Sequence, residues 1–193
     1  SDEQRIYLRK ANGMVRDAIR SPHMMRLRGN MGLGHVRYPT AGSKSASESQ
    51  PFYVNSPYGL SLVHNGNLTN TLELADDLEK TDLRHLNTGS DSEVLLNVFA
   101  HELQKHQSLP LTAEAIFKTI KAVYRRVRGA YSVIVMINNF GMVAFRDPHG
   151  IRPLAIGQRV HASGADIMLA SESIALDALG FEHLLDIQAG EGV

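Results

Sequence analysis

Residues 131–147 read YSVIVMINNFGMVAFRD, two apolar runs separated by a short segment rich in asparagine and glycine. The runs Tyr131–Ile137 and Met142–Asp147 contain β-branched and aromatic residues, which favour strands. The Asn-Asn-Phe-Gly segment between them is typical of a hairpin turn, because asparagine and glycine tolerate positive φ. This stretch therefore predicts two adjacent antiparallel strands.

Further strands and helices are predicted around this hairpin in groups. Two more strands follow it, at Leu154–Gln158 and Ile167–Ser171, and a short helix is expected at Glu172–Leu179. Two adjacent helices are expected directly before it. Strands in groups favour antiparallel sheets with helices placed outside them. The predicted fold class is α+β, and a doubly wound nucleotide-binding fold is excluded.

Helix start signals occur at three places in the middle of the chain. Two of them have the spacing of capping boxes, in which each side chain bonds the other's backbone. These pairs are Asn70 with Glu73 and Ser90 with Glu93. Thr112 is the expected cap of a third helix, and Gly129 is expected to end that helix.

The composition narrows the classes of function. The chain has 193 residues, of which 43% are hydrophobic, and its 20 basic and 20 acidic residues cancel. This balance gives no electrostatic case for a nucleic-acid partner, and the longest apolar run is too short to span a membrane. The absence of cysteine removes disulfides, thiolate metal sites and thiol catalysis from these residues. A cytoplasmic location is expected.

Residues 62–69 read LVHNGNLT, an apolar run that stops at an Asn-Gly pair before a predicted helix. Asn65 and Gly66 are interpreted first as a sharp turn, because both residues tolerate positive φ. A second interpretation is functional. An amide side chain beside an exposed backbone N–H can form an oxyanion hole.

Two charged residues allow both a structural and a functional interpretation. Arg37 is predicted at the end of a strand, Met31–Tyr38, before a mobile surface loop at Pro39–Pro51. It could clamp a substrate carboxylate or simply be a surface arginine. Asp91 is predicted in the first turn of a helix, where the helix dipole stabilises a carboxylate. It could also bind a substrate ammonium group.

Several familiar motifs are not supported by their context. The Gly-rich segment GNMGLG at 29–34 is followed by a predicted strand, whereas a dinucleotide-binding loop is followed by a helix. The nine histidines show no recognisable zinc-binding spacing. A nucleophile elbow of the G-x-S-x-G type is also absent from the sequence.

Five motifs, taken together and in order, resemble one family. They are GHVRYPTAGS, LVHNGNLTN, NTGSDSEVLLNVFAHEL, FRDPHGIRPLAIG and ASESIALDALGF. The resemblance is to the glutamine-hydrolysing domain of the amidophosphoribosyltransferases, a branch of the class II glutamine amidotransferases. It covers essentially the whole chain, so residues 1–193 are expected to be one such domain. Asparagine synthetase and glucosamine-6-phosphate synthase are alternative relatives within class II.

The resemblance implies a fold and a set of site residues. The fold would be a four-layer αββα sandwich of two antiparallel sheets, as in N-terminal-nucleophile hydrolases. Arg37 would bind the glutamine α-carboxylate, Asp91 its α-ammonium group, and Asn65 with Gly66 would form the oxyanion hole. Thr40 and His64 would complete the substrate-binding residues.

The resemblance also implies a nucleophile that these residues do not contain. The family uses an N-terminal cysteine, and this sequence has none. The chain is therefore expected to be N-terminally truncated, to lack the phosphoribosyltransferase domain, and to be inactive alone. The alternative is a non-catalytic glutamine-binding or interaction fragment.

The resemblance implies few other components for this domain. Cofactors are not expected here, and Mg²⁺ is expected only in the phosphoribosyltransferase domain. The expected partners are glutamine, that second domain and further copies of the chain, with neither nucleic acid nor membrane.

Overall fold

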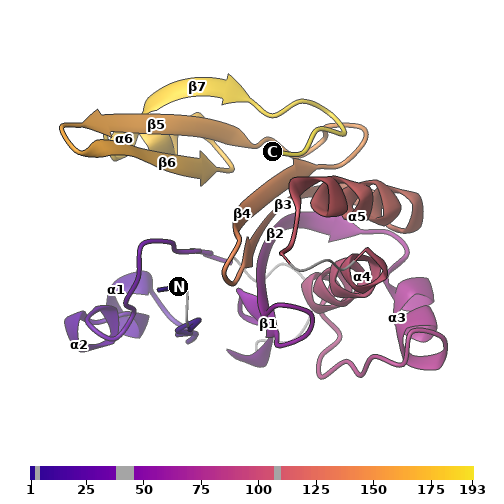
Figure 1. Cartoon of the computed structure of the whole chain (residues 1–193). Coiled ribbons are helices and arrows are strands. Elements are labelled where there is room, and N and C mark those ends of the chain that lie inside the picture. Colours follow the sequence, from indigo (N-terminus) through magenta and orange to yellow (C-terminus); the bar gives the residue numbers. More distant parts are fainter. Residues whose placement is uncertain (3–4, 38–45, 107–109) are drawn as a thin grey trace.

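The computed structural model describes residues 1–2, 5–37, 46–106 and 110–193. Two antiparallel sheets and the helices around them make the fold α+β, as predicted (Figure 1). In the described residues the first sheet has the strand order β1-β2-β3-β4 and the second has the order β6-β5-β7.

The hairpin at 131–147 lies in the first sheet. β3 (Gly129–Ile137) pairs with β4 (Gly141–Arg146), and β2 (Leu60–Leu68) lies on the other side of β3. β1 (Phe52–Val54) is short and pairs only with the first residues of β2. The rest of that edge of β2 is therefore not covered by β1.

Three helices cover one face of this sheet (Figure 1). They are α3 (Thr71–Lys80), α4 (Asp91–Lys105) and α5 (Ala113–Arg126). Nearly every residue of the first three turns of α4 is buried, because this helix packs between the sheet and its two neighbours. Its apolar side chains form the main core together with those of β2, β3 and β4.

The helix-start predictions were right about position and only partly right about mechanism. The hydroxyl of Thr112 accepts the N–H of Ala115 at 3.3 Å, so this cap is confirmed. The Asn70 and Ser90 side chains do not cap their helices in the described structure. Asn70 instead reaches the C-terminal end of α5, donating to the carbonyl of Arg126 at 2.9 Å.

The second sheet completes the predicted layers. It consists of β5 (Ala155–His161), β6 (Gly164–Ala170) and β7 (Glu182–Asp186). A small apolar cluster containing Ala144, Leu154 and Ile187 joins the two sheets. The outer helix α6 (Ser173–Ala178) buries Leu176 against the second sheet. The order helices, sheet, sheet, helix gives the αββα arrangement.

In the N-terminal part the strand prediction was wrong, and the loop prediction is tested only over its last residues. Residues 31–37 belong to no strand of the described structure, whereas a strand was predicted at Met31–Tyr38. Of the predicted loop Pro39–Pro51, residues 39–45 lie outside the described part, and Ala46–Glu48 forms a 3₁₀ helix in which Glu48 is buried. Short helices occur at Val15–Ala18 (α1) and Ser21–Met24 (α2).

Gly129 begins β3, although it was predicted to end the preceding helix, which stops at Arg126. Its φ is 144°, and a Cβ at this position would lie 2.3 Å from the carbonyl oxygen of Asn67. Glycine is therefore needed here because the backbones of β2 and β3 approach closely.

Candidate functional site

A cavity of about 500 Å³ opens between β2, the start of α4 and the segment before β1. All of the predicted site residues that the structure describes line it, namely Arg37, His64, Asn65, Gly66 and Asp91. Thr40, which was also predicted to bind substrate, lies outside the described residues. The structure thus brings together side chains and backbone groups that are far apart in the sequence.

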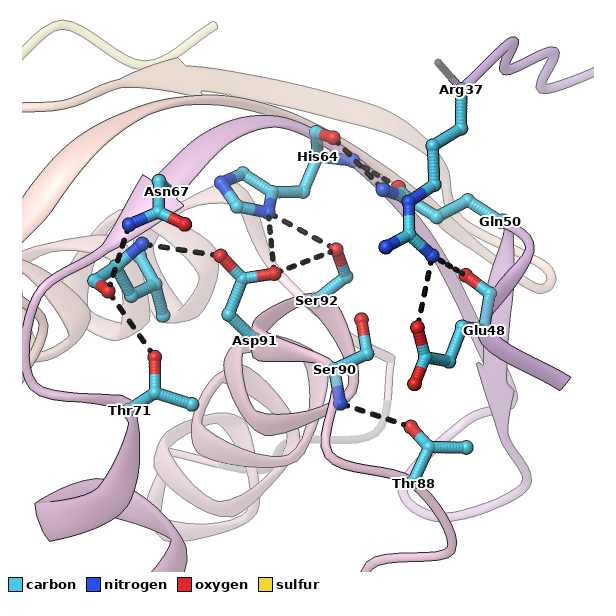
Figure 2. Close-up of polar contacts among 11 residues, drawn as sticks. Arg37, Glu48, Gln50, His64, Asn67, Thr71, Thr88, Ser90, Asp91 and Ser92 are labelled. Atoms are coloured by element: carbon cyan, nitrogen blue, oxygen red, sulfur yellow. Dashed lines mark hydrogen bonds and ion pairs between the residues drawn. The ribbon is translucent and has the colours of Figure 1, made fainter. Parts of the chain in front are cut away.

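The uncovered edge of β2 forms one wall of the cavity. Next to the short β1, the side-chain amide of Gln50 binds both the N–H and the carbonyl of the His64 backbone (Figure 2). The His64 N–H donates to Oε1 of Gln50 at 2.6 Å, and Nε2 of Gln50 donates to the His64 carbonyl at 3.0 Å. Further along, the Leu68 N–H donates to Oδ2 of Asp91 at 3.2 Å.

Gly66 lies on this edge between His64 and Leu68. Its partner in register on β3 is Tyr131, whose backbone N–H and carbonyl are both bonded to Asp147 on the far side. Gly66 is therefore in a non-hydrogen-bonded pair, and its N–H points away from β3. This N–H faces the cavity, with the Asn65 side chain next to it in sequence.

The predicted sharp turn at Asn65-Gly66 is wrong, because both residues belong to the continuous strand β2. Gly66 has a φ of 149°, and a Cβ there would lie 1.9 Å from the carbonyl oxygen of Ala130. The glycine is required by the close approach of β3 and by its own backbone conformation. The turn interpretation therefore gave the wrong reason for the glycine. The Gly66 N–H nevertheless lies where a donor of an oxyanion hole could lie.

Asp91 is the first residue of α4, as its predicted place in the first helical turn required. Its carboxylate accepts the Leu68 N–H through Oδ2 and the Ser92 hydroxyl through Oδ1, the latter at 3.4 Å (Figure 2). The side chain is 23% exposed. The position at the helix N-terminus suits a negatively charged group, because the helix dipole is positive at this end.

Arg37 reaches the cavity from irregular backbone rather than from a strand end. Its Nη1 lies 3.1 Å from Oε2 of Glu48 and 3.5 Å from the carbonyl oxygen of the same residue (Figure 2). The Arg37 side chain is 31% exposed, and that of Glu48 is 10% exposed. Arg37 is therefore an exposed residue with an ion-pair partner, and its role as a substrate clamp stays a prediction.

His64 is buried at the back of the cavity. Its Nδ1 lies 3.1 Å from Oγ of Ser92 and 3.8 Å from Oδ1 of Asp91. Its Nε2 is buried and finds no hydrogen-bond partner among the described residues. Burial lowers the pKa of His64 to about 4, against the opposing effect of Asp91, and His35 and Arg152 lower it further.

Sequence reasoning missed four residues of the site. Glu48 and Gln50 fell in a segment interpreted as a loop, and Ser92 was taken only as part of a helix start. Arg152 comes from the segment DPHGIRP, where a cluster of turn-forming residues was the available signal. A local pattern carries no information on which distant side chains these residues meet.

The segment that carries Arg152 is held rigidly by its two preceding charged residues. The buried carboxylate of Asp147 accepts the backbone N–H groups of Tyr131, His149 and Ile151. The guanidinium of Arg146 donates to the carbonyls of Gly150, Arg152 and Ile187. The Arg152 side chain therefore lines the cavity from a loop that these hydrogen bonds hold in place, at the junction of the two sheets.

Other kinds of site find little support in the described part of the chain. Three or more metal-ligating side chains are nowhere grouped closely enough there to hold a metal ion. The helices described also include none long and apolar enough to cross a membrane.

The comparison with known families assigns a class to this fold and site. Residues 35–178 match the family described as glutamine amidotransferase domain. The match covers most of the chain and includes each of the predicted site residues, so the chain belongs to this family.

Within that class, the chain is similar to amidophosphoribosyltransferases. It is 59% identical to that of Escherichia coli over 187 residues, which are 96% of this chain and 37% of the relative. It is 56% identical to that of Pseudomonas aeruginosa over 191 residues, covering 99% of this chain and 38% of the relative. The chain thus spans less than two fifths of the length of these relatives.

The fold agrees with a solved structure of the same kind. The glutamine phosphoribosylpyrophosphate amidotransferase from B. subtilis, solved with ADP and GMP, superposes with a TM-score of 0.77 at 28% identity. The superposition covers 100% of this chain and 38% of that one. The boundaries 1–193 for a single domain stay a prediction.

Proposed function

We propose that this chain is the glutamine-binding part of the glutaminase domain of an amidophosphoribosyltransferase. The observation that carries the proposal is the arrangement of three kinds of group around one cavity. Arg37 supplies a cation, Asp91 supplies an anion, and the open edge of β2 supplies N–H donors near Gly66. An amino acid with an amide side chain has the complementary groups.

Glutamine would be held at its two charged ends. Its α-carboxylate would bind the guanidinium of Arg37, which can form two parallel hydrogen bonds with a carboxylate. Its α-ammonium group would bind the carboxylate of Asp91 at the start of α4. Thr40 is proposed to contribute to the same subsite, in keeping with the family resemblance.

The side-chain amide of glutamine would then lie against Asn65 and Gly66. When a thiolate attacks the amide carbon, its oxygen becomes an oxyanion, and the Gly66 N–H with the Asn65 amide would donate to it. Collapse of this intermediate would release ammonia and leave a thioester for water to hydrolyse. The 193 residues contain no cysteine, so we propose that they bind glutamine without turning it over.

The released ammonia would serve a second reaction in the longer protein. We propose that it converts phosphoribosyl pyrophosphate to phosphoribosylamine in a phosphoribosyltransferase domain, as the names of the relatives suggest. Mg²⁺ is proposed to act in that domain, with no cofactor in this one. A homo-oligomeric state, a cytoplasmic location and a role in purine synthesis are part of the same proposal.

Calorimetric titration of the 193-residue chain with glutamine tests the proposal directly. We expect one glutamine site, with much weaker binding of asparagine because its amide would fall short of Gly66. Arg37→Ala and Asp91→Ala should each weaken glutamine binding by about 100-fold, the equivalent of one charged hydrogen-bonded contact. A chain that folds and yet binds no glutamine would contradict the proposal.

The catalytic part of the proposal has its own tests. A sample whose intact mass matches these 193 residues should release no ammonia from glutamine. The gene should encode a cysteine directly after its initiator Met, before the codon for Ser1. Its absence would favour the second candidate, a non-catalytic glutamine-binding module, which the lack of cysteine in these residues supports.

A further inference from the structure

We propose that His64 and Ser92 form a directional hydrogen-bond relay that positions the Asp91 carboxylate for a ligand ammonium group. The inference rests on the proposed function, because it assumes that Asp91 binds such a group. Ser92 was not among the predicted site residues. His64 was predicted to touch substrate, and here it acts through its neighbours.

The His64 side chain, from β2, reaches the side chains of Ser92 and Asp91 at the start of α4 (Figure 2). Nδ1 of His64 is 3.1 Å from Oγ of Ser92, and that oxygen is 3.4 Å from Oδ1 of Asp91. Ser92 is 2% exposed and His64 is 3% exposed, so water cannot replace either partner without a rearrangement. The direct distance from Nδ1 to Oδ1, 3.8 Å, is too long for a good hydrogen bond.

The chemistry of the groups fixes the direction of the relay. A carboxylate can only accept hydrogen bonds, so the hydroxyl of Ser92 must donate to Asp91. A hydroxyl has a single proton, and Ser92 must therefore accept from His64. The proton of the neutral imidazole is thus on Nδ1, and Nε2 is left as the unprotonated nitrogen.

The surroundings of the ring favour this neutral form. A proton on the buried Nε2 would have no acceptor among the described residues. The groups that act electrostatically on the ring are Asp91 from α4, His35 from the N-terminal segment and Arg152 from the loop after β4. Of these, only Asp91 favours a charged imidazole, and burial outweighs it.

The backbone of His64 is fixed as firmly as its ring. The Gln50 side chain binds both the N–H and the carbonyl of the His64 backbone. The relay therefore starts from a rigid residue and ends on the carboxylate that faces the ligand. With the Leu68 N–H on Oδ2, each oxygen of Asp91 has one internal donor, and its other lone pairs can accept from an ammonium group.

The tautomer can be measured without any substitution. Nitrogen-15 NMR of the chain labelled at histidine should show His64 as the neutral Nδ1–H tautomer at pH 7. The Nε2–H tautomer, or a protonated ring, would overturn the relay. This measurement does not depend on glutamine binding, so it separates the relay from the proposed function.

Calorimetric titration with two ligands tests what the relay does. Ser92→Ala should weaken binding of glutamine by about tenfold, the equivalent of about one hydrogen bond. It should weaken binding of 4-carbamoylbutanoate, which is glutamine without the ammonium group, by less than about twofold. Ser92→Thr keeps the hydroxyl and should restore glutamine binding to near the wild-type value.

Two substitutions of His64 provide a matched pair. His64→Asn places an amide N–H near the position of Nδ1, and His64→Gln places it nearer to Nε2. Glutamine binding should survive better in the asparagine variant. Equal losses for both ligands in Ser92→Ala, or better binding by the glutamine variant, would refute the positioning role. Failure of the wild-type chain to bind glutamine would count against the proposed function instead.

Discussion

Oε2 of Glu48 lies 3.1 Å from Nη1 of Arg37, so a buried protein carboxylate is paired with the cation that is proposed to bind the ligand carboxylate. The carbonyl oxygen of Glu48 lies beside the same nitrogen at 3.5 Å. A ligand carboxylate at Arg37 must therefore compete with Glu48, or share the guanidinium with it. This pairing was not predicted, because Glu48 fell in a segment interpreted as a mobile loop.

Glu48→Gln is expected to tighten glutamine binding. The substitution removes the competing negative charge while it keeps the size of the side chain and an oxygen for Arg37. A gain of about three- to tenfold in affinity is expected, the equivalent of a partly exposed ion pair. Calorimetric titration measures it, with Glu114→Gln as control, because Glu114 pairs with Lys118 on α5 away from the cavity. Weaker binding by the Glu48 variant would show that this carboxylate instead holds Arg37 in place.

Gly66→Ala is expected to destabilise the chain by at least about 2 kcal/mol, because of its positive φ and the clash with Ala130. Gly59→Ala is the matched control. Gly59 also has a positive φ, 73°, but the nearest atom to a Cβ there is 3.6 Å away. The Gly59→Ala variant should therefore lose only about 1 kcal/mol of stability. Urea denaturation compares the two, and equal losses would show that the close approach of β3 at Gly66 is unimportant.

The stability of the chain should fall as the pH drops from about 6.5 to about 4 because of His64. The folded-state pKa of His64 is about 4, below its ordinary value of 6.5. Between these values the unfolded chain binds a proton that the folded chain does not, so acid favours unfolding. The loss at pH 4 is at most about 3 kcal/mol. Above about pH 6.5 this contribution is fully present.

Comparison with His64→Asn isolates this effect from that of the other titrating groups. Urea denaturation at pH 7.5 and at pH 4.5 should show a smaller loss of stability in the variant than in the wild-type chain. The same loss in both proteins would mean that His64 titrates normally.

Asn70→Ala is expected to destabilise the chain by about 1–3 kcal/mol, more than the loss of an exposed helix cap. The amide of Asn70 donates to the Arg126 carbonyl and accepts the Arg128 N–H, each at 2.9 Å. Its removal would leave both backbone groups without this partner at the turn between α5 and β3. Asn55→Ala, at an exposed loop position, should change stability by less than about 0.5 kcal/mol. Similar thermal melting of the two variants would contradict this role for Asn70.

The sequence by itself predicted the class of fold and most of the elements around the hairpin. The strands at 131–137 and 142–147 and the amphipathic helices before them depend on local patterns of apolar residues. Such patterns report which face of an element is buried, and they do so without knowledge of its neighbours. The family motifs also indicated five residues that the structure places around one cavity, from Arg37 to Asp91.

Only the tertiary structure decided how the site is built. Asn65 and Gly66 were predicted to turn the chain, yet they continue β2. The glycine is needed because β3 approaches Gly66 too closely for any side chain. Asn70 with Glu73, and Ser90 with Glu93, had the spacing of capping boxes. Asn70 bonds to the carbonyl of Arg126 and the N–H of Arg128 at the end of α5, and Glu93 accepts the N–H groups of Asn87 and Thr88. In each case the same polar group could be satisfied locally or by a distant partner, and packing determined which.

The contacts between site residues could not be predicted from the sequence for the same reason. Glu48 contacts Arg37, and Ser92 links His64 to Asp91. These contacts form only when β2, α4 and the N-terminal segment pack together. Local sequence specifies which residue can donate, accept or carry charge. Which of these groups face one another is decided by the packing of the whole chain, since that packing sets their distances and excludes water from between them.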